Sequence, residues 1–548
     1  MTMINWTNWM DCPRKLFLFF LIAGGVAFYN GLNHPFMIDD HVFFDEMGRN
    51  PRNLLLNLIP DKAKVLNLEG PSTEVYYRPL ALLVPRIIFL IFGGNVFFMH
   101  LANLLLFVTA AWLWARLLGR WSGDMLFATL TAVFLLVHPL NGIIVNFKTA
   151  GIFALQLIFM AFVSDWMVRQ KPIRPWASIA FLLGAFFCHE STFVLPPSLT
   201  VARVLYRKES WKQAVMNLLP LWIAGGLYFF LRMHWASLGT NLFDKFSAYH
   251  MTMWQFAASW FSLQAWYMSK FFVPQGIVIW ALRPVVYQNP MDWLVPGFAI
   301  WFMVVWTIRR FLCDQVWMWV GLSWLAIGLV MMAVGSLFQG DQLMIEPHWL
   351  VFPSIGFFMM LANLIVLGMR SRLKFFVLAA VALLLFVWLK WDWWYNALWN
   401  KEIGYCYHWM QENPTFKPVN MYIARAYVQE GKLDLAAKHY EMALMNQYPD
   451  YLMYTNLGSI ALIKGDLDKA EVYLKKSLVI EPRGRGALNS LGIVFIKKKD
   501  FKKAEECFQR AIAANRFDST ALKNLRMLEN YKATHRENAS TTAPLRLE

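Results

Sequence analysis

The sequence predicts an all-α protein in two parts, a polytopic membrane helix bundle followed by a soluble α-solenoid. Two observations carry this prediction. The chain has 548 residues, of which 58% are hydrophobic and 16% are charged, a balance too apolar for a soluble protein of this length. Near the carboxy terminus the composition changes and small residues recur every 34 positions, which indicates stacked helical repeats.

The net charge of +16 does not indicate nucleic-acid binding. Lysines and arginines fall in short clusters between apolar runs, or alternate with acids after Lys401. Such clusters are typical of membrane topology signals, and the alternating pattern is typical of a solvated helical face. The five cysteines show no CxxC or paired spacing, so neither a disulfide framework nor a metal knuckle is indicated.

The first apolar segment, 16–33, follows Arg14 and Lys15 and has no small-residue cleavage site near its end. We interpret it as an uncleaved anchor that enters from the cytoplasm. Residues 34–78 then form the first outer loop, which opens on the adjacent carboxylates Asp39 and Asp40. A loop of this length tends to carry function.

Positive residues at the ends of later apolar runs predict a cytoplasmic amino terminus and repeats on the outer side. Two apolar stretches, 79–92 and 254–272, are expected to lie at the membrane surface, because crossing by the second would turn Arg309 and Arg310 outward. Eleven spans are predicted: 16–33, 96–118, 125–137, 149–168, 176–187, 192–206, 214–231, 293–308, 317–334, 349–369 and 375–390.

The carboxy-terminal region carries the tetratricopeptide (TPR) signature. Small residues, Ala424, Gly458 and Gly492, recur at a spacing of 34 where two helices should touch. The same spacing relates Ala436, Ala470 and Ala504, and also Tyr440, Leu474 and Phe508. Three repeats are about the minimum that can bury a continuous core. They offer a concave face for an extended partner, or alternatively form a folded cap that stabilises the membrane part.

The predicted domain plan follows from these patterns. Residues 1–395 form the transmembrane domain and residues 396–417 a linker. About three TPR repeats occupy residues 418–531, and residues 532–548 form a disordered tail.

Ionisable residues gather near the predicted outer ends of the spans, where they are functional candidates by default. Because all of them fall on the outer side of the membrane, we expect them to line one shared cavity. The candidates are Asp39, Asp40, Tyr77, Arg78, His138, Lys148, His189, Glu190, Glu346 and His348.

Such a cavity suits transfer of a group from a lipid-linked phosphate. A carboxylate can take the proton from an attacking hydroxyl, while arginine, lysine and histidine hold the phosphate leaving group. Each residue also has a structural alternative. Asp39 or Asp40 could cap a helix in the loop, and His138 is as well suited to a polar cap as to a ligand.

Several short motifs occur in an order that resembles one known family. They are Asp39-Asp40, Tyr76-Tyr77-Arg78-Pro79-Leu80, His138-Pro139, His189-Glu190 and Pro353-Ser354-Ile355-Gly356. Together with the trailing repeats, they resemble the transmembrane-and-TPR O-mannosyltransferases and their bacterial relatives, within the GT-C class of membrane glycosyltransferases. The resemblance implies transfer of a sugar from a polyprenyl phosphate or pyrophosphate to a hydroxyl on the outer face, with inversion.

The resemblance also implies roles for individual residues. Asp40 is favoured over Asp39 as the base, and Arg78 would bind the lipid phosphate. The chain departs from the family at Gly151, where an arginine is usual and only Lys148 could replace it. A second departure is Glu346, which lies one residue further than expected from the late Pro-Ser, with His348 in between.

No cofactor is expected. Asp39, Asp40 and Glu346 could together bind a divalent cation, but there is no fuller set of carboxylates, so the predicted reaction is metal-independent. The expected partners are a polyprenyl-linked sugar donor, membrane lipid, and a protein or glycan acceptor that the repeats could hold. The expected location is a bacterial inner membrane, with the repeats in the periplasm.

Two other functions stay open from the sequence. One is a ligase or polymerase that moves whole oligosaccharides from a lipid-pyrophosphate carrier. The other is a non-enzymatic, membrane-anchored TPR scaffold, although eleven spans exceed what an anchor needs. A transporter is disfavoured, because the ionisable candidates cluster at one side of the membrane and no inverted repeat is visible.

Overall fold

The computed structural model describes most of the chain as two compact units, residues 1–401 and 402–548. The described residues are 12–37, 78–168, 175–235, 252–278, 281–284, 286, 288–335, 337–339, 342–345, 347–412, 417–445, 451–514 and 519–537.

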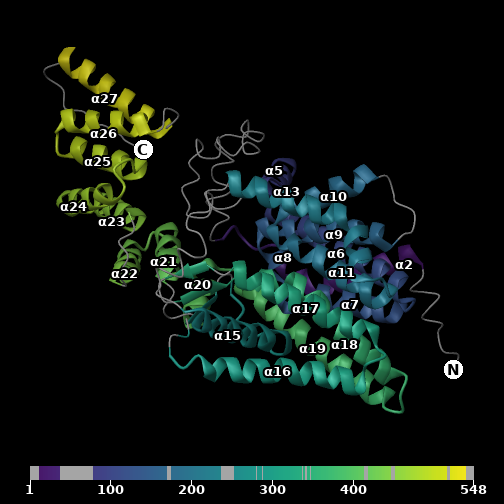
Figure 1. The fold of residues 1–548 in the computed structure, drawn as a ribbon. Coiled ribbons are helices and arrows are strands. Elements are labelled where there is room, and N and C mark those ends of the chain that lie inside the picture. Colours follow the sequence, from purple (N-terminus) through teal and green to yellow (C-terminus); the bar gives the residue numbers. More distant parts are fainter. Residues whose placement is uncertain are drawn as a thin grey trace. The chain divides into compact units, whose positions relative to one another are not determined.

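The first unit is a helix bundle (Figure 1). Its amino-terminal elements are α2 (Pro13–Phe28), η1 (Tyr29–Gly31), α5 (Pro79–Phe92), α6 (Val96–Ser122), α7 (Met125–Val137), η4 (Pro139–Asn141), α8 (Ile143–Asn146), η5 (Lys148–Ala150) and α9 (Gly151–Val168). Then follow α10 (Pro175–Cys188), η6 (Glu190–Val194), α11 (Leu195–Arg207), α12 (Trp211–Asn217), α13 (Leu219–Trp235), α15 (Met253–Phe272), α16 (Met291–Phe311), α17 (Val316–Gly335), η7 (Pro347–Leu350), α18 (Val351–Met369) and α19 (Lys374–Leu398).

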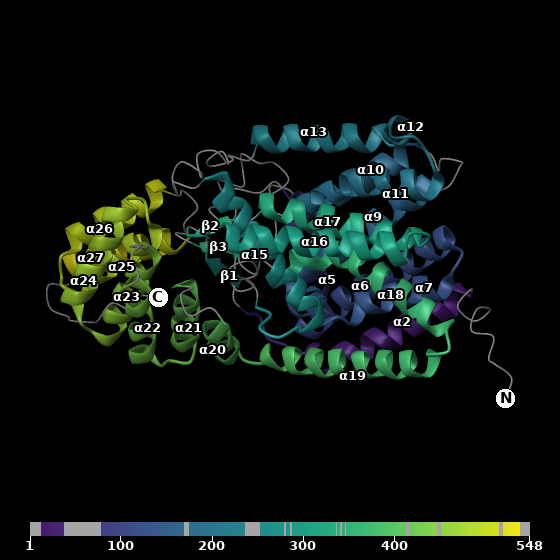
Figure 2. The same cartoon turned by 60° about the horizontal axis from the view of Figure 1, so that its bottom comes forward.

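Helix α6 lies at the centre of this unit and packs against α2, α7 and α9. The buried Trp114 of α6 meets Trp324 of α17 edge to face, with ring centroids 5.7 Å apart, and its indole N–H donates to the Leu157 carbonyl of α9. At the periphery α19 packs on α2, and α13 packs on α10 (Figure 2). The core therefore lies around α6, α7, α17 and α18.

Glycines allow α17 and α18 to cross closely. A Cβ added to Gly356 would lie 2.4 Å from the Gly321 carbonyl oxygen, and one added to Gly328 would lie 2.6 Å from the Pro353 ring. Small residues at helix crossings are typical of membrane bundles. Pro353 and Gly356, two residues of a motif that the sequence analysis singled out, thus have a packing role.

A small antiparallel sheet was not predicted from the sequence. Its strands are β1 (Ala281–Pro284), β2 (Leu337–Gln339) and β3 (Gln342–Ile345), in the order β1-β3-β2 with Ala281 opposite Ile345. Strand β3 ends at Ile345, shortly before η7, which begins at Pro347 and carries His348. The other elements of the described residues are helical, as predicted.

Several helices are long and apolar enough to cross a membrane. Within the described part of the chain there are five, or seven if two bent pairs, 125–146 and 211–230, each form one span. Each of the eleven predicted spans overlaps helical residues, but several of these helices are short or bent, so the number of crossings stays a prediction. Helix α15 is not among the five, and it packs against α16. Its location at the membrane surface stays a prediction.

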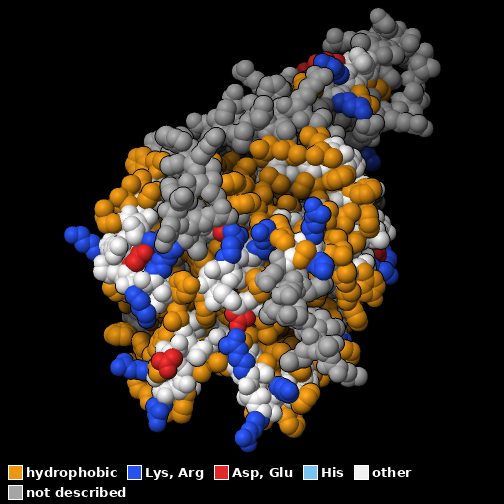
Figure 3. Space-filling view, turned by 90° about the vertical axis from the view of Figure 1, so that its right-hand side faces the viewer, with side chains coloured by type: hydrophobic (Ala, Val, Ile, Leu, Met, Phe, Trp, Pro, Cys, Tyr) orange, Lys and Arg blue, Asp and Glu red, His pale blue; other side chains and the backbone are white. Residues whose placement is uncertain are grey.

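Two ion pairs connect helix ends that the sequence analysis assigned to the cytoplasmic side. Arg120 near the end of α6 lies 2.8 Å from Asp165 near the end of α9, and Arg370 after α18 lies 2.7 Å from Asp124 before α7. The face on the right of Figure 1 carries many lysine and arginine side chains among hydrophobic ones (Figure 3). The ends of α6, α9 and α18 and the start of α7 therefore share one side of the bundle, while the predicted topology itself stays a prediction.

The second unit consists of helix pairs. Gly458 faces the Leu474 side chain, to which an added Cβ would lie 2.6 Å away, and Gly492 faces the Phe508 ring at 2.5 Å. This confirms that the 34-residue period marks helix contacts. The helices are α20 (Glu402–Glu412), α21 (Lys417–Gln429), α22 (Leu433–Met445), α23 (Tyr451–Lys464), α24 (Leu467–Ile480), α25 (Arg485–Lys497), α26 (Phe501–Ala514) and α27 (Ser519–Glu537).

The helices also extend into segments that were predicted to be irregular. Helix α20 lies within the predicted linker 396–417 and packs against α21. Helix α27 runs to Glu537, into the predicted tail 532–548. A buried core cluster of this unit includes Leu474, Leu491 and Phe508, so the unit has a hydrophobic core of its own.

Candidate functional site

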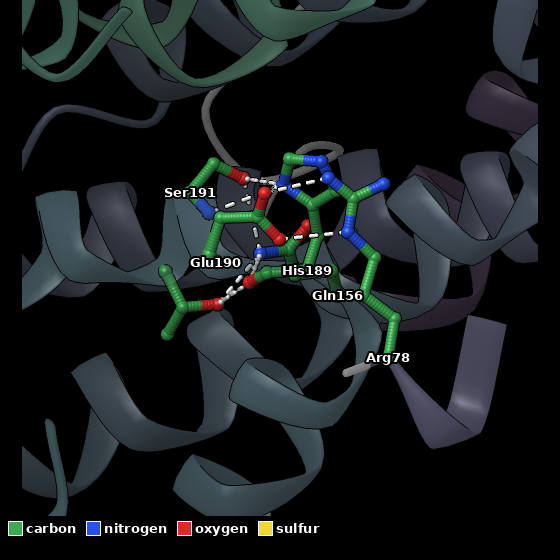
Figure 4. Close-up of polar contacts among 6 residues, drawn as sticks. Arg78, Gln156, His189, Glu190 and Ser191 are labelled. Carbon is green, nitrogen blue, oxygen red and sulfur yellow. Dashed lines mark hydrogen bonds and ion pairs between the residues drawn. The ribbon is translucent and has the colours of Figure 1, made fainter. Parts of the chain in front are cut away.

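The best-defined polar feature of the first unit is a two-pronged ion pair between Arg78 and Glu190 (Figure 4). Arg78 Nε donates to Glu190 Oε2 at 2.7 Å and Nη2 donates to Oε1 at 2.6 Å. Each side chain is 20% exposed. Arg78 precedes Pro79, the first residue of α5, and Glu190 opens η6 after α10. Two predicted site residues, 112 positions apart, therefore meet.

Gln156 and His189 fix the turn that presents Glu190. The Nδ1 of His189 accepts from the Ser191 backbone N–H at 3.1 Å. The Gln156 amide, from the middle of α9, donates to the His189 carbonyl at 2.8 Å and to Thr192 Oγ1 at 2.6 Å. Gln156 was not predicted from the sequence, although a polar residue within the apolar run 149–168 is a usable signal.

Aromatic contacts place His348 near the turn that carries His189 and Glu190. The ring of Phe153 in α9 lies 4.5 Å from the His348 ring and 5.1 Å from the His189 ring, measured between centroids. His348 comes from η7, which packs against η4. Arg78, His189, Glu190 and His348 are therefore one group, built from three loop segments around the first turns of α9.

Lys148 lies next to this group, in η5 just before α9 begins. Its side chain is buried, donates to the Pro35 carbonyl and lies over the Phe36 ring, 4.8 Å from the centroid. Helix α5 contacts both η5 and α9. Burial, and to a lesser extent the nearby Lys148 charge, lowers the pKa of the neighbouring His34 to about 4. His34 was not among the predicted residues.

The surroundings of Gly151 account for the absence of the arginine that the resemblance leads us to expect at this position. A Cβ at this position would lie 2.0 Å from Asn103 Oδ1. Asn103 is buried and donates to the Lys148 carbonyl at 3.1 Å. There is thus no room for an arginine side chain here, and the asparagine instead fixes the turn that carries Lys148.

His138 is separate from this group. Its Nδ1 accepts from the Leu140 N–H at 3.2 Å, so Nε2 carries the proton and donates to the Phe271 carbonyl at 3.1 Å. The ring is fully buried, and the Trp388 ring centroid lies 4.5 Å away. Both nitrogens are used within the protein, so the geometry is that of a polar cap at the end of α7. A ligand role for His138 stays a prediction, and the contacts of its ring are those of a structural residue.

Four predicted site residues, Asp39, Asp40, Tyr77 and Glu346, lie outside the described residues. Their roles stay predictions. Among the residues that the structure describes, no group of three or more histidine, cysteine, aspartate or glutamate side chains could hold a metal ion.

Comparison with known proteins identifies the repeats. Two family models described as tetratricopeptide repeat match residues 423–483 and 486–518. The carboxy-terminal region therefore contains TPR repeats, as predicted. No curated protein matches the chain.

Solved structures give weaker similarity. The crystal structure of MamA is 16% identical, covering 25% of this chain and 80% of that one, with a TM-score of 0.23. The Sgt2 TPR domain from Aspergillus fumigatus is 18% identical, covering 23% and 86%, with a TM-score of 0.22. At TM-scores of this size the similarity carries no information on function.

Proposed function

We propose that this protein is an integral-membrane glycosyltransferase. It moves a sugar from a polyprenyl-phosphate carrier to a hydroxyl of a protein or glycan on the outer side of the membrane. The observation that carries the proposal is the gathering of Arg78, Lys148, Glu190 and His348, from separate elements, at one end of an apolar bundle. Ionisable groups in such a bundle are expensive to bury, which makes them substrate-site candidates.

That end lies opposite the Arg120–Asp165 and Arg370–Asp124 ion pairs. Helix α9 starts beside Lys148 and ends near Asp165, and α18 starts after His348 and ends before Arg370. If the basic ends face the cytoplasm, the candidate group faces outward. A donor carried by a lipid would reach it from the outer leaflet.

The Arg78–Glu190 pair suits recognition of the donor phosphate. Glu190 holds the planar guanidinium in a fixed orientation, so an incoming phosphate meets an ordered fork of donors rather than a mobile side chain. Since Glu190 also cancels the charge of Arg78, net attraction for the phosphate needs a second cation. Lys148, in the adjacent turn, supplies it.

In the proposed reaction Asp40, or else Asp39, takes the proton of the acceptor hydroxyl as its oxygen attacks the anomeric carbon. The bond from that carbon to the carrier phosphate breaks with its electron pair on the phosphate oxygen, and the configuration inverts. Arg78 and Lys148 stabilise the charge that develops there. In support, Phe36 before the acidic loop lies against Lys148, and Arg78 after it occupies the position directly before α5.

The test is chemical analysis of the cell envelope. Cells lacking the gene are complemented with wild type or with the double variant D39N/D40N, and envelope proteins and polysaccharides are analysed by mass spectrometry. We expect a single added sugar with wild type and none with the variant. Full modification by the double variant, at equal membrane abundance, would refute the proposed glycosyltransferase mechanism.

The same assay separates two alternatives. Addition of a preassembled block of sugars identifies an oligosaccharide ligase or polymerase instead. The TPR repeats themselves favour a second candidate, a membrane-anchored scaffold that binds proteins. In that case residues 402–548 fused to one unrelated membrane span should restore the phenotype of the deleted strain. Failure of this fusion, with the full chain active, supports the enzyme.

A further inference from the structure

The second unit contains a groove between α24 and α26, the second helices of two successive repeats. Its volume is about 410 Å³, the size of sites that hold a small ligand or a few side chains of a peptide. The first helices of the repeats pack directly on one another, α23 on α25 and α25 on α27, so they form the inner row of the stack. The groove is therefore distinct from the concave face that stacked repeats offer to an extended partner.

The floor of this groove is apolar and rigid. It is formed by Leu491 and Phe495 of α25, with Leu478 and Val479 of α24 beside them. Leu491 and Phe495 belong to the buried core cluster of the unit, and Leu478 packs against that cluster. Val479 differs from the others, because it is 81% exposed. Its apolar side chain gains stability when a partner covers it.

The rim of the groove is basic. The charged residues among its described lining are Lys475, Lys503, Arg510 and Glu506. Lys475 and Lys503 form ion pairs with Glu471 and Asp500, but the two lysine side chains are 61% and 59% exposed. Exposed ion pairs contribute little stability, so a carboxylate of a ligand can compete for these lysines. Arg510 donates to a neutral group, the Pro482 carbonyl, at 3.3 Å.

The sequence concentrates positive charge in the segment that forms the groove. Residues 475–510 contain ten lysines and arginines and four acids, whereas the other residues of 402–548 contain twelve and thirteen. A positive potential of this kind attracts ligands of opposite charge and selects against basic ones. An apolar floor within a basic rim is thus complementary to a peptide in which acids flank a bulky apolar side chain.

We propose that the groove between α24 and α26 binds an acidic peptide segment of a partner protein. A bulky apolar side chain of the peptide lies on Leu491, Phe495 and Val479, and its carboxylates meet Lys475 and Arg510. An anionic membrane surface fits less well, because Leu491 and Phe495 are 4% and 7% exposed and lie recessed between two helices. The proposal concerns the second unit alone and is independent of the transferase function.

The experiment selects peptides on the full-length protein, held in nanodiscs of zwitterionic lipid. The probe is a phage library of random short peptides, and the enriched peptides are labelled with fluorescein and titrated by fluorescence anisotropy. We expect enriched sequences to combine aspartate or glutamate with leucine, isoleucine or phenylalanine. Their binding should weaken as the salt concentration rises, because the rim charges are exposed to solvent.

Two matched pairs of variants place the peptide in the groove. Val479→Glu adds a repelling charge beside the floor and should weaken binding at least about tenfold. Ile463→Glu makes the same change at a residue of α23 that is 65% exposed and outside the groove, and should bind like wild type.

Lys475→Gln removes a rim charge and should weaken binding, whereas Lys476→Gln should not. Lys476 is the next residue, but its ammonium lies over the Tyr454 ring, 5.8 Å from the centroid. Loss of Lys475 leaves Glu471 paired with Lys498 at 2.8 Å. All four replaced side chains are exposed, so the variants should fold, and an unchanged Tm verifies this.

Three results would overturn the proposal. One is the absence of an enriched acidic motif, and another is equal affinity of Val479→Glu and Ile463→Glu for the enriched peptides. The third comes from co-sedimentation of the nanodiscs with phosphatidylglycerol vesicles. If these vesicles bind wild type but not Val479→Glu or Lys475→Gln, and no peptide is enriched, the groove serves an anionic lipid surface instead.

Discussion

Replacing Arg78 with lysine tests whether the Arg78–Glu190 pair serves a substrate or only the fold. Lysine keeps the positive charge but loses the planar fork. The chain offers a matched control in Arg203 and Glu209, which form the same two-pronged pair with N–O distances of 2.8 and 2.7 Å. Arg203 lies near the end of α11 and Glu209 lies between α11 and α12, at an end predicted to be cytoplasmic.

The expected loss of stability is modest and similar for the two pairs. Two unit charges about 4 Å apart attract by roughly 4 kcal/mol at an effective dielectric constant of about 20, and desolvation offsets much of this. At 20% exposure for Arg78 and 13% for Arg203, we expect a net coupling of about 1–3 kcal/mol for each pair. Because lysine retains one hydrogen bond, Arg78→Lys and Arg203→Lys should each cost about 1 kcal/mol, a small decrease in Tm.

The two variants should differ in donor binding. Titration of the purified protein with polyprenyl phosphate, followed by tryptophan fluorescence, should show affinity at least about tenfold weaker for Arg78→Lys, because about 1.4 kcal/mol corresponds to a factor of ten. Arg203→Lys should bind like wild type. Equal affinity in both variants, with matching decreases in Tm, would mean that the Arg78–Glu190 pair is purely structural.

Three further predictions concern packing and pH. Gly492→Ala in residues 402–548 should lower the unfolding free energy by about 1–3 kcal/mol, because its methyl group meets the buried Phe508 ring at 2.5 Å, as measured by urea denaturation. The same unit should lose stability as the pH falls below about 6.5, since burial lowers the pKa of His439 in the folded state and the unfolded chain binds the proton first. Gly151→Ala should lower the Tm of the full chain, because its Cβ would lie 2.0 Å from a buried asparagine oxygen.

Matched variants control for these effects. Gly486→Ala, where the nearest atom lies at 3.5 Å, should be neutral or slightly stabilising, and so should Gly25→Ala, which meets nothing within 4 Å. His439→Gln should flatten the pH dependence between about 5 and 7. If the glycine variants at crowded and open positions lose equal stability, or the pH profile survives in His439→Gln, the corresponding contact is not the cause.

The repeats could be predicted in detail because their contacts are local and periodic. A small residue every 34 positions implies a bulky neighbour from the next helix, and in the structure Gly458 lies against Leu474 and Gly492 against Phe508. The apolar helices were equally visible, since hydropathy alone indicates them. The three-stranded sheet was not, because strands of three and four residues show no usable alternation.

The candidate site could be predicted only in part. Sequence position indicated that Arg78 and Glu190 share a side of the bundle, but their pairing depends on how α5 meets α10. The burial of His138 likewise follows from Phe271 and Trp388, which are distant in sequence. The burial of Asp392 could not be predicted, because a single acid beside four tryptophans is typical of the end of a span. The packing of η4 against α19 shows that this residue is enclosed.

The measurement closest to the central claim is sugar transfer by the purified full-length protein. Membrane lipids from the source cells, metabolically labelled in their sugars, serve as donor, and envelope protein from a strain lacking the gene serves as acceptor. We predict labelled acceptor with wild type and with Arg203→Lys, loss with Asp39→Asn/Asp40→Asn, and strong reduction with Arg78→Lys. Equal labelling by all four proteins, or none by wild type with active lipid donor present, would contradict the account.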